Sequence, residues 1–295
     1  MLRNVPFKIE SSLARCWFRV AGMRPSSSPF VTGDSFRSIA NHVLDGQVSF
    51  DSSRIKRGQI VFVETPCLSL FAQRHLPSIT EPFVLITHNG DLNIDDSFSE
   101  TAAHKRIVHW FAQNAVLKHP KVTAVPIGLE NRHLHTNGVI RDFRRLAQGT
   151  SVKKARILYA FTVGTNRKER APAWDALKAC AIADGLQRVN SRAYLKTLAG
   201  YMTVASPPGN GIDCHRTWEA LYLKTIPVVR RSPFYDSFPG LPVLPVDDWN
   251  EIRLWDEPFL NSSYEKLAPQ IETTPYLHFG YWEARIRDAC SEAAS

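Results

Sequence analysis

The chain has 295 residues, of which 44% are hydrophobic and 22% are charged, a composition typical of one large or two medium globular domains. Its 36 Lys and Arg against 28 Asp and Glu give a net charge of +8, which favours an anionic partner: a phosphate-bearing ligand, nucleic acid or an acidic membrane face. The five scattered cysteines, without a CxxC pair, suggest neither a disulfide framework nor a zinc site.

Targeting signals give no positive indication. No apolar run approaches the roughly 20 residues of a membrane span, and the N-terminus has no continuous apolar segment of a signal peptide. We therefore expect a cytoplasmic protein, with peripheral membrane association through basic and aromatic residues left open.

The first half of the chain alternates apolar runs with turn residues. A helix is expected over 36–44, with Asp34 or Ser35 as its N-cap. A short helix over 11–23 and strands over 30–32, 59–64, 82–87 and 121–127 complete the predictions for this half.

The composition changes near residues 136–152, where turn residues flank a basic helix, and we place the connection between two halves there. In the second half we expect strands over 155–161, 201–205, 226–229 and 241–246, and helices over 172–183, 191–199 and 283–294. Strands that alternate with helices predict an α/β fold with mostly parallel sheets.

Ligands of parallel sheets gather at the carboxyl ends of the strands, so the turns after the strands are the candidate sites. The most informative one runs from residue 206 to 229, where a Gly-rich loop leads into a short helix. Asp213, Arg216 and Glu219 recur every third residue, which places them on nearly one helix face. Arg216 suits a bidentate phosphate contact, and Glu219 suits a vicinal diol such as ribose. The alternative is a surface salt bridge between Arg216 and Glu219, with Asp213 as N-cap.

The stretch Gly209-Asn-Gly-Ile-Asp-Cys-His-Arg-Thr-Trp-Glu-Ala-Leu-Tyr-Leu, followed by Ile226-Pro-Val-Val229, resembles the donor-binding segment of exostosin-like glycosyltransferases. Glu-Ala-Leu followed by Pro-Val-Val is also similar to a signature of many GT-B enzymes. The resemblance is strongest over residues 206–230 and weaker over 125–131 and 161–166.

The resemblance implies a GT-B-like fold, in which two Rossmann-like domains face each other across a cleft. Residues 1–148 would bind the acceptor, residues 149–275 would hold the nucleotide-sugar, and residues 276–295 would form a terminal helix that packs back on the first domain. Lys224 departs from the family pattern, because Gly is common there. Ile212 stands where a retaining enzyme usually has a Glu, which favours an inverting mechanism.

The family's donor site carries over residue by residue. Glu219 would hold the ribose and Arg216 the diphosphate, while Gly209 and Gly211 would leave backbone room beside the phosphates. The implied donor-binding residues are Gly164, Thr165, Asn166, Arg167, Gly209, Asn210, Gly211, Asp213, Arg216 and Glu219. His215 and Glu219 have metal-ligand spacing, but no third ligand is evident, so no metal is expected.

An inverting transfer needs one base to deprotonate the acceptor hydroxyl. Asp34 and Asp91 are the candidates, with His88 as a third catalytic choice. Each has a structural alternative: N-cap for Asp34, turn former for Asp91 and a packing role for His88. Glu64 and Arg37 are assigned to the acceptor, with Glu64 a further choice of base and Asp34 itself an alternative partner for Arg37.

These residues predict a hexosyl- or pentosyltransferase of polysaccharide biosynthesis. It would use a UDP- or GDP-linked sugar as co-substrate, with no cofactor or metal, and would act on a glycan, a lipid-linked acceptor or another hydroxyl. A non-catalytic nucleotide- or glycan-binding module is the alternative. A nucleic-acid partner is not expected, because the positive charge is dispersed and no such motif is present.

Overall fold

The computed structural model describes residues 7–20, 23–47, 49–149 and 152–294. The chain divides into two compact units. One, the β1–β5 unit, comprises residues 25–127, 211–213 and 278–295; the other, the β6–β10 unit, comprises residues 1–24, 128–210 and 214–277. This division differs from the predicted one at residue 148, because residues 1–24 and 128–148 group with the second sheet. Residues 150–151, just after that predicted boundary, lie outside the described residues.

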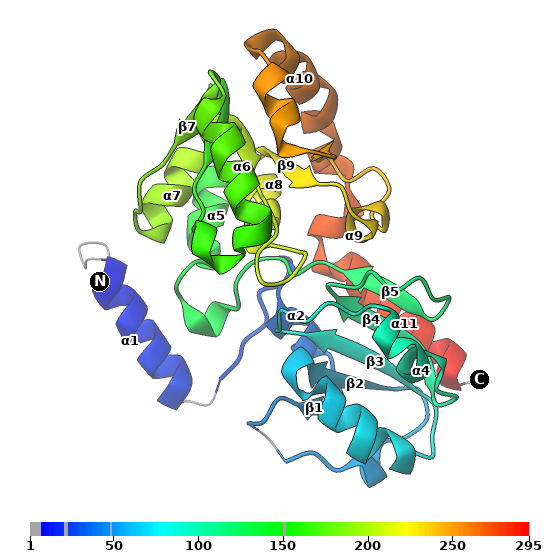
Figure 1. Cartoon of the computed structure of the whole chain (residues 1–295). Coiled ribbons are helices and arrows are strands. Elements are labelled where there is room, and N and C mark those ends of the chain that lie inside the picture. The colour runs from blue at the N-terminus through cyan, green and yellow to red at the C-terminus, as the bar shows by residue number, and fades with distance from the viewer. Residues whose placement is uncertain (1–6, 21–22, 48, 150–151, 295) are drawn as a thin grey trace. The chain divides into compact units, whose positions relative to one another are not determined.

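The β1–β5 unit is built on a parallel sheet with strand order β1-β2-β3-β4-β5 (Figure 1). Its strands are β1 (His42–Leu44), β2 (Gln59–Glu64), β3 (Phe83–His88), β4 (Ile107–Gln113) and β5 (Val122–Val125). Its helices are α2 (Gly33–Ser38), α3 (Leu68–Leu70), α4 (Ser99–Ala103) and α11 (Phe279–Ala294). The central strand β3 is buried along its whole length, as expected for a parallel strand covered on both faces. The terminal helix α11 packs on β3 and β4.

The helix predicted over 36–44 is wrong. Helix α2 ends at Ser38, and the chain continues into the edge strand β1. Asn41 explains the change, because its backbone N–H and its side chain both bond the backbone of Ile60 in β2. The cap is also different: the Thr32 hydroxyl accepts from the Ser35 N–H at 3.1 Å, so Thr32 is the N-cap and residues 30–32 form no strand.

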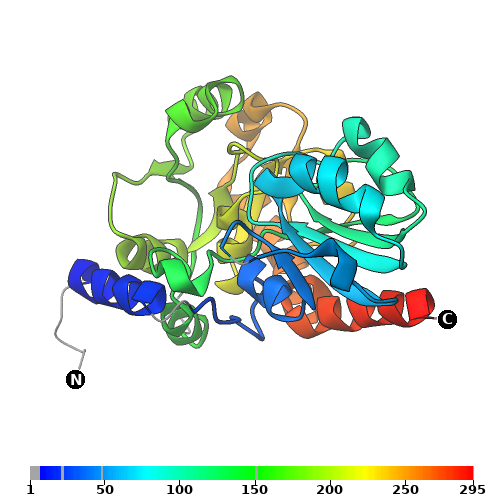
Figure 2. The same cartoon turned by 90° about the horizontal axis from the view of Figure 1, so that it is seen from below.

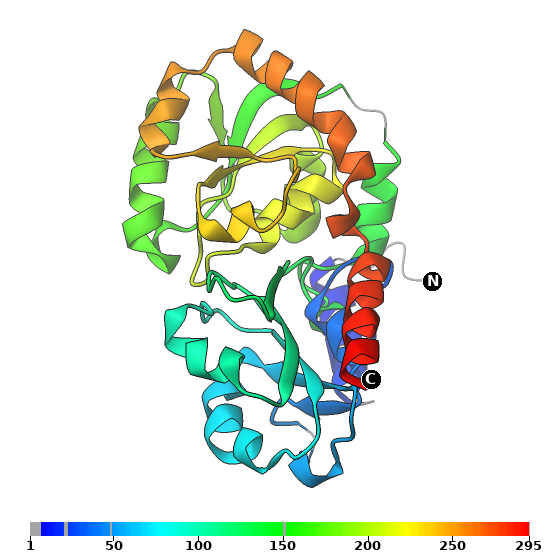
Figure 3. The same ribbon diagram turned by 90° about the vertical axis from the view of Figure 1, so that its right-hand side faces the viewer.

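The β6–β10 unit contains a second parallel sheet, with strand order β10-β9-β8-β6-β7. Its strands are β6 (Lys154–Tyr159), β7 (Ala183–Gly185), β8 (Tyr201–Ala205), β9 (Ile226–Arg230) and β10 (Leu244–Val246). Its helices are α1 (Phe7–Val20), α5 (Ile140–Ala147), α6 (Arg167–Ala179), α7 (Ser191–Leu198), α8 (His215–Tyr222), α9 (Pro233–Asp236) and α10 (Glu257–Thr273). Figure 3 shows α10 lying along this sheet, where it contacts β6, β8 and β9. The two sheets confirm the predicted α/β class.

Helix α6 begins five residues before the predicted start at Pro172. The Asn166 side chain accepts from the Glu169 N–H at 3.3 Å and so caps the helix. Pro172 therefore lies inside the helix rather than in its first turn, and Arg170 becomes a helical residue.

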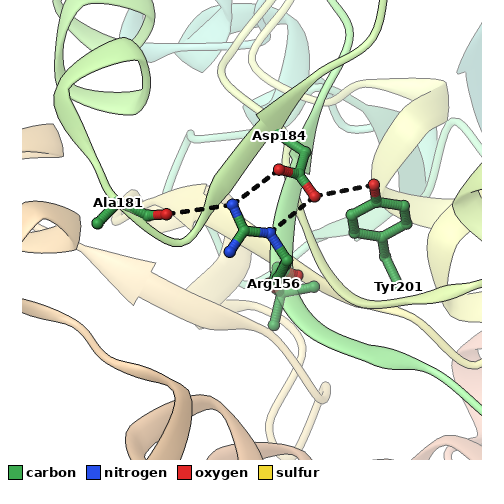
Figure 4. A network of polar contacts seen from close by, with 5 residues as sticks. Arg156, Ala181, Asp184 and Tyr201 are labelled. Carbon is green, nitrogen blue, oxygen red and sulfur yellow. Dashed lines mark hydrogen bonds and ion pairs between the residues drawn. The ribbon is translucent and has the colours of Figure 1, made fainter.

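The short strand β7 is tied to its neighbours by side chains (Figure 4). Arg156 of β6 donates two hydrogen bonds to Asp184 of β7, from Nε and Nη2, each 2.8 Å long. The Tyr201 hydroxyl donates to the same carboxylate at 3.0 Å. Arg156 foremost, and then Tyr201, hold the pKa of Asp184 below its usual value against the effect of burial. This network adds side-chain bonds to the backbone pairing of β7 with β6.

The strand order of the second sheet creates a topological switch point between β6 and β8. From β6 the chain passes to β7 on one side, and then returns across β6 to β8 on the other. Connections that leave in opposite directions open a crevice at the carboxyl ends of the two strands, where open α/β sheets bind ligands. A ligand-binding site is therefore expected at the loops after β6 and β8.

Candidate functional site

The loops after β6 and β8 are bonded to each other. The Asn166 side-chain amide donates to the Gly209 carbonyl at 2.7 Å. Arg170 reaches both loops, because its Nε donates to Pro208 O at 2.8 Å and its Nη1 donates to Thr162 O at 3.0 Å. Burial, and then the positive charge of Arg216, lower the pKa of Arg170. The N-terminal part of α6 thus fixes the Gly-rich loop and brings a buried cation to the switch point.

Arg216 is the second residue of α8 and adds a second cation. Its Nη2 donates to Ala160 O at 3.1 Å, just beyond β6. The guanidinium groups of Arg216 and Arg170 each lie 5.9 Å from the centre of the Phe161 ring. Two like charges held around one ring repel each other, so a bound anion between or beside them would be stabilised.

Arg216 also has unmet hydrogen-bonding capacity. Its Nε and Nη1 atoms are buried and have no hydrogen-bond partner within the described part of the chain. The hydroxyl of Tyr194 in α7 is likewise buried without a partner at hydrogen-bonding geometry, although it lies near enough to Arg216 for a weak side-chain interaction and for the arginine charge to act on its pKa. Burial raises the pKa of Tyr194, so this hydroxyl keeps its proton and can donate. Single buried polar atoms without a hydrogen-bond partner occur at seven other residues of the described chain, but only Arg216 has two of them on one side chain. Such groups are uncommon in native proteins.

Glu219 lies one helical turn after Arg216 and is only 6% exposed. Burial raises its pKa to about 7, the charge of Arg216 acts in the opposite direction, and Glu130 adds a smaller upward effect. Among the described residues, no group donates a hydrogen bond to the Glu219 carboxylate or forms an ion pair with it. The alternative of an exposed Arg216–Glu219 salt bridge is therefore not what the structure contains.

The glycines of the loop have a different role from the predicted one. A side chain at Gly209 would come within 3.1 Å of Arg170 Nη2, and one at Gly211 within 2.5 Å of Asn114 Nδ2. Their missing side chains therefore make room for protein groups in this structure. Asp213 lies outside α8: its Oδ2 accepts from the Ile127 N–H at 2.8 Å, within the β1–β5 unit. It is therefore neither the cap of α8 nor on the face of Arg216 and Glu219.

The remaining predicted donor residues lie on the surface of the same loops. Gly164, Thr165, Arg167 and Asn210 are exposed. Arg167 makes no hydrogen bond or ion pair with a described residue, whereas Arg170, three positions later, is buried. The cation from α6 that lies near Arg216 is therefore Arg170, which was not predicted, rather than the predicted Arg167.

His88, at the end of β3, is only 1% exposed, and both ring nitrogens are used. Nδ1 accepts from the Asn89 N–H at 2.8 Å, so the proton lies on Nε2, which donates to Pro126 O at 3.1 Å. A side chain at Gly33 would collide with Asn89 and His88, so the start of α2 packs directly on this turn. His88 has the bonding of a packing residue rather than a base.

The other candidates of the β1–β5 unit differ in access to solvent. Asp34 is 0% exposed, whereas Asp91 is exposed after the β3 turn. Glu64 is half-buried and accepts from the Asn89 amide at 3.4 Å. Arg37 forms an ion pair with Asp45, at 2.8 Å between Nη2 and Oδ2. Its charged partner is therefore Asp45 rather than Asp34.

No family model matches the sequence, and neither does any curated protein. Among solved structures, a UDP-forming α,α-trehalose-phosphate synthase from Burkholderia vietnamiensis is 9% identical, with a TM-score of 0.46 over 80% of this chain and 75% of that one. An E. coli trehalose-6-phosphate structure bound with UDP-2-fluoro glucose is 9% identical, with a TM-score of 0.49 over 80% and 74%. An α1,3-fucosyltransferase is 10% identical, with a TM-score of 0.43 over 79% and 78%.

Each of these TM-scores is below 0.5. These similarities therefore decide nothing about function, which must be inferred from the residues of this chain. The exostosin-like resemblance also stays a prediction.

Three residues of the site escaped the sequence analysis: Arg170, Tyr194 and Phe161. The signal for Arg170 was present, because Asn166 followed by Glu169 is a helix-start pattern. Recognising it would have placed Arg170 in the first turns of α6, beside the loop it holds. No local pattern marks Tyr194, whose position depends on how α7 packs.

Proposed function

We propose that this chain is a glycosyltransferase that takes its sugar from a nucleoside-diphosphate donor bound at the β6–β8 switch point. The observation that carries the proposal is Arg216, a partly buried arginine with two buried, unpartnered nitrogens beside the Arg170 charge. A diphosphate would accept from both nitrogens and offset the repulsion between the two cations. The resemblance of residues 206–230 to exostosin-like donor segments supports the same assignment.

Glu219 would accept hydrogen bonds from the two ribose hydroxyls. A carboxylate can accept both at once, and nothing in the described chain occupies it. Arg216 and Glu219 lie three residues apart on α8, so one helix face would present both side chains together. Arg216 would donate hydrogen bonds to phosphate, and Glu219 would accept hydrogen bonds from a diol. The amides of the first turn of α8 add a favourable field for the phosphates.

The transfer itself would be inverting and independent of metal. A base takes the proton from an acceptor hydroxyl, whose oxygen bonds the anomeric carbon while the bond to the diphosphate breaks. The charge that develops on the leaving diphosphate would be stabilised by Arg216 and the α8 N-terminus. We assign the base to Asp91, because it is the exposed one of the two aspartates and an acceptor can reach it. The expected acceptor is a glycan or a lipid-linked hydroxyl.

Donor binding is tested by calorimetry with UDP and GDP on the intact chain. Arg216→Ala is expected to weaken the affinity at least tenfold, because it removes a charged hydrogen-bonding group from the diphosphate. Arg167→Ala is the matched control: the same type of residue, at the start of α6 after the neighbouring strand β6, but exposed, and it should change affinity less than threefold. Equal affinities for wild type and Arg216→Ala would refute the site.

Catalysis is tested by release of nucleoside diphosphate from a panel of UDP- and GDP-sugars, with and without acceptor glycans. Asp91→Asn should abolish turnover while leaving nucleotide affinity unchanged, and EDTA should leave the wild-type rate unchanged. Nucleotide binding with no turnover of any donor would instead favour a binding module. Loss of turnover in Asp34→Asn but not in Asp91→Asn would move the base to Asp34.

A further inference from the structure

Helix α1 is docked on the β6–β10 unit by an acidic residue. Glu10 is only 6% exposed, and its carboxylate is 2.5 Å from Arg141 Nη2 and 2.9 Å from Arg192 Nη2. Ser11 and Phe18 of the same helix are also buried. Figure 2 shows α1 at the rim of this unit. One face of the helix is thus fixed by charge as well as by packing.

The face of α1 that adjoins this docked face is apolar and open to solvent. Ile9, Leu13, Trp17 and Val20 follow each other at intervals of four, four and three residues, which puts them in one stripe. Their exposures are 52%, 58%, 59% and 84%. A helix at a protein surface usually buries its apolar stripe and exposes its carboxylates. In α1 a carboxylate faces inward and a tryptophan faces outward.

Arginines border this stripe on the remaining face. Arg15 and Arg19 are both exposed, although Arg15 also donates to the Thr136 hydroxyl at 3.1 Å. The chain as a whole carries a net charge of +8. The exposed surface of α1 therefore combines bulky apolar side chains, one of them a tryptophan, with positive charge. That combination is characteristic of helices that lie in the interface of an anionic lipid bilayer.

We propose that α1 is a membrane-docking helix, which inserts Ile9, Leu13, Trp17 and Val20 among the lipids and pairs its arginines with anionic headgroups. The helix would lie in the plane of the interface, since no helix in the described part of the chain is long and apolar enough to span a bilayer. Trp17 suits this depth, because its ring has an apolar body and a polar N–H. The inference does not depend on the proposed glycosyltransferase activity.

Size and charge favour lipid over a second copy of the chain. A stable interface between proteins needs roughly 20–30 residues on each side, and the stripe provides four. Two α1 helices packed face to face would also bring four arginines, two from each helix, close to a small contact. An anionic bilayer needs no shape match and is attracted by those same arginines.

The test is flotation of the full chain with vesicles of phosphatidylcholine alone or mixed with phosphatidylglycerol. Binding to the mixed vesicles is expected, and it should weaken as salt rises because the arginine contribution is screened. The double variant Leu13→Glu with Trp17→Glu should lose at least tenfold in partitioning. Leu254→Glu is the matched control, because Leu254 is 87% exposed in the same unit but far along the chain from α1; it should bind like wild type.

Arg19→Gln separates the electrostatic part, with an expected loss of about fivefold on the mixed vesicles. The substituted side chains are exposed, so unchanged circular dichroism and melting temperature should accompany each loss. Absence of wild-type binding, or equal binding by the double variant, would overturn the proposal. So would a wild-type dimer in sedimentation that the double variant abolishes without any vesicle binding, since the stripe would then serve a second copy.

Discussion

Replacing Glu219 by Gln should stabilise the folded protein while it damages nucleotide binding. The carboxyl has a pKa of about 7 when folded, against an ordinary value of 4.5. Each unit of pKa corresponds to about 1.4 kcal/mol, so ionised Glu219 costs the folded state up to about 3 kcal/mol. Glutamine has nearly the same shape and no charge, so this cost disappears.

The sign of the pH dependence follows from proton binding. Between pH 4.5 and 7 the folded state keeps the proton on Glu219 and the unfolded state has lost it, so folding stability falls as pH rises through this window. Glu219→Gln should therefore gain roughly 1–3 kcal/mol over wild type at pH 8, and less than about 1 kcal/mol at pH 5. Because the comparison is between two variants at each pH, other titrating groups cancel.

Urea denaturation at pH 5, 6, 7 and 8 measures this difference, and calorimetry with UDP and GDP at pH 8 measures the second part. Affinity should fall about tenfold to a hundredfold, because a charged acceptor of the ribose hydroxyls is lost. A stability difference that does not change with pH, or a variant less stable than wild type at pH 8, would show that Glu219 is held ionised in the fold. The reasoning from burial would then be wrong.

Three further outcomes are expected. Arg170→Lys should weaken nucleotide binding severalfold and lower the melting temperature, because lysine cannot reproduce the two loop contacts, whereas Arg167→Ala should change neither. Lys224→Gly should raise stability by up to about 1 kcal/mol in urea denaturation, since Lys224 has φ of +56° and glycine adopts that conformation without strain; the exposed Lys224–Glu272 pair that is lost contributes little. Burial lowers the pKa of His109 to about 4, so wild type should lose stability between pH 6.5 and 4, and His109→Gln should lose less over that range.

The strands were the easiest elements to predict, because their apolar runs are buried on both faces. The bounds of β2 and β8 match the sequence prediction residue for residue. Helix α10 was missed because its pattern is weak: it contains Pro269, and it buries few apolar side chains, Leu260 and Ile271 among them. The edge strand β1 was also missed, since it depends on pairing with β2, which no local pattern records.

Site residues were predictable where chemistry and helix spacing coincide. Arg216 and Glu219 were expected on one helix face, and both lie in α8 one turn apart; their contacts with phosphate and ribose stay predictions. Asp213 has the same spacing but lies before the helix begins, so periodicity alone misplaced it. Lys224 shows the converse: comparison with the family pattern marked it as unusual, and its backbone does adopt the left-handed conformation that favours Gly.

The arrangement of Arg216, Arg170 and Glu219 carries several separate energetic costs. Glu219 is buried with its pKa raised, the pKa of Arg170 is lowered by burial and by Arg216, and two nitrogens of Arg216 have no partner among the described residues. Each of these costs would be removed by one ligand that presents phosphate oxygens to the arginines and hydroxyls to the carboxylate. Functional sites commonly trade stability for binding in this way. The same reasoning predicts that a nucleoside diphosphate should stabilise this chain more than inorganic phosphate at equal ligand concentration, because only the nucleotide also satisfies Glu219 and it therefore has the lower Kd.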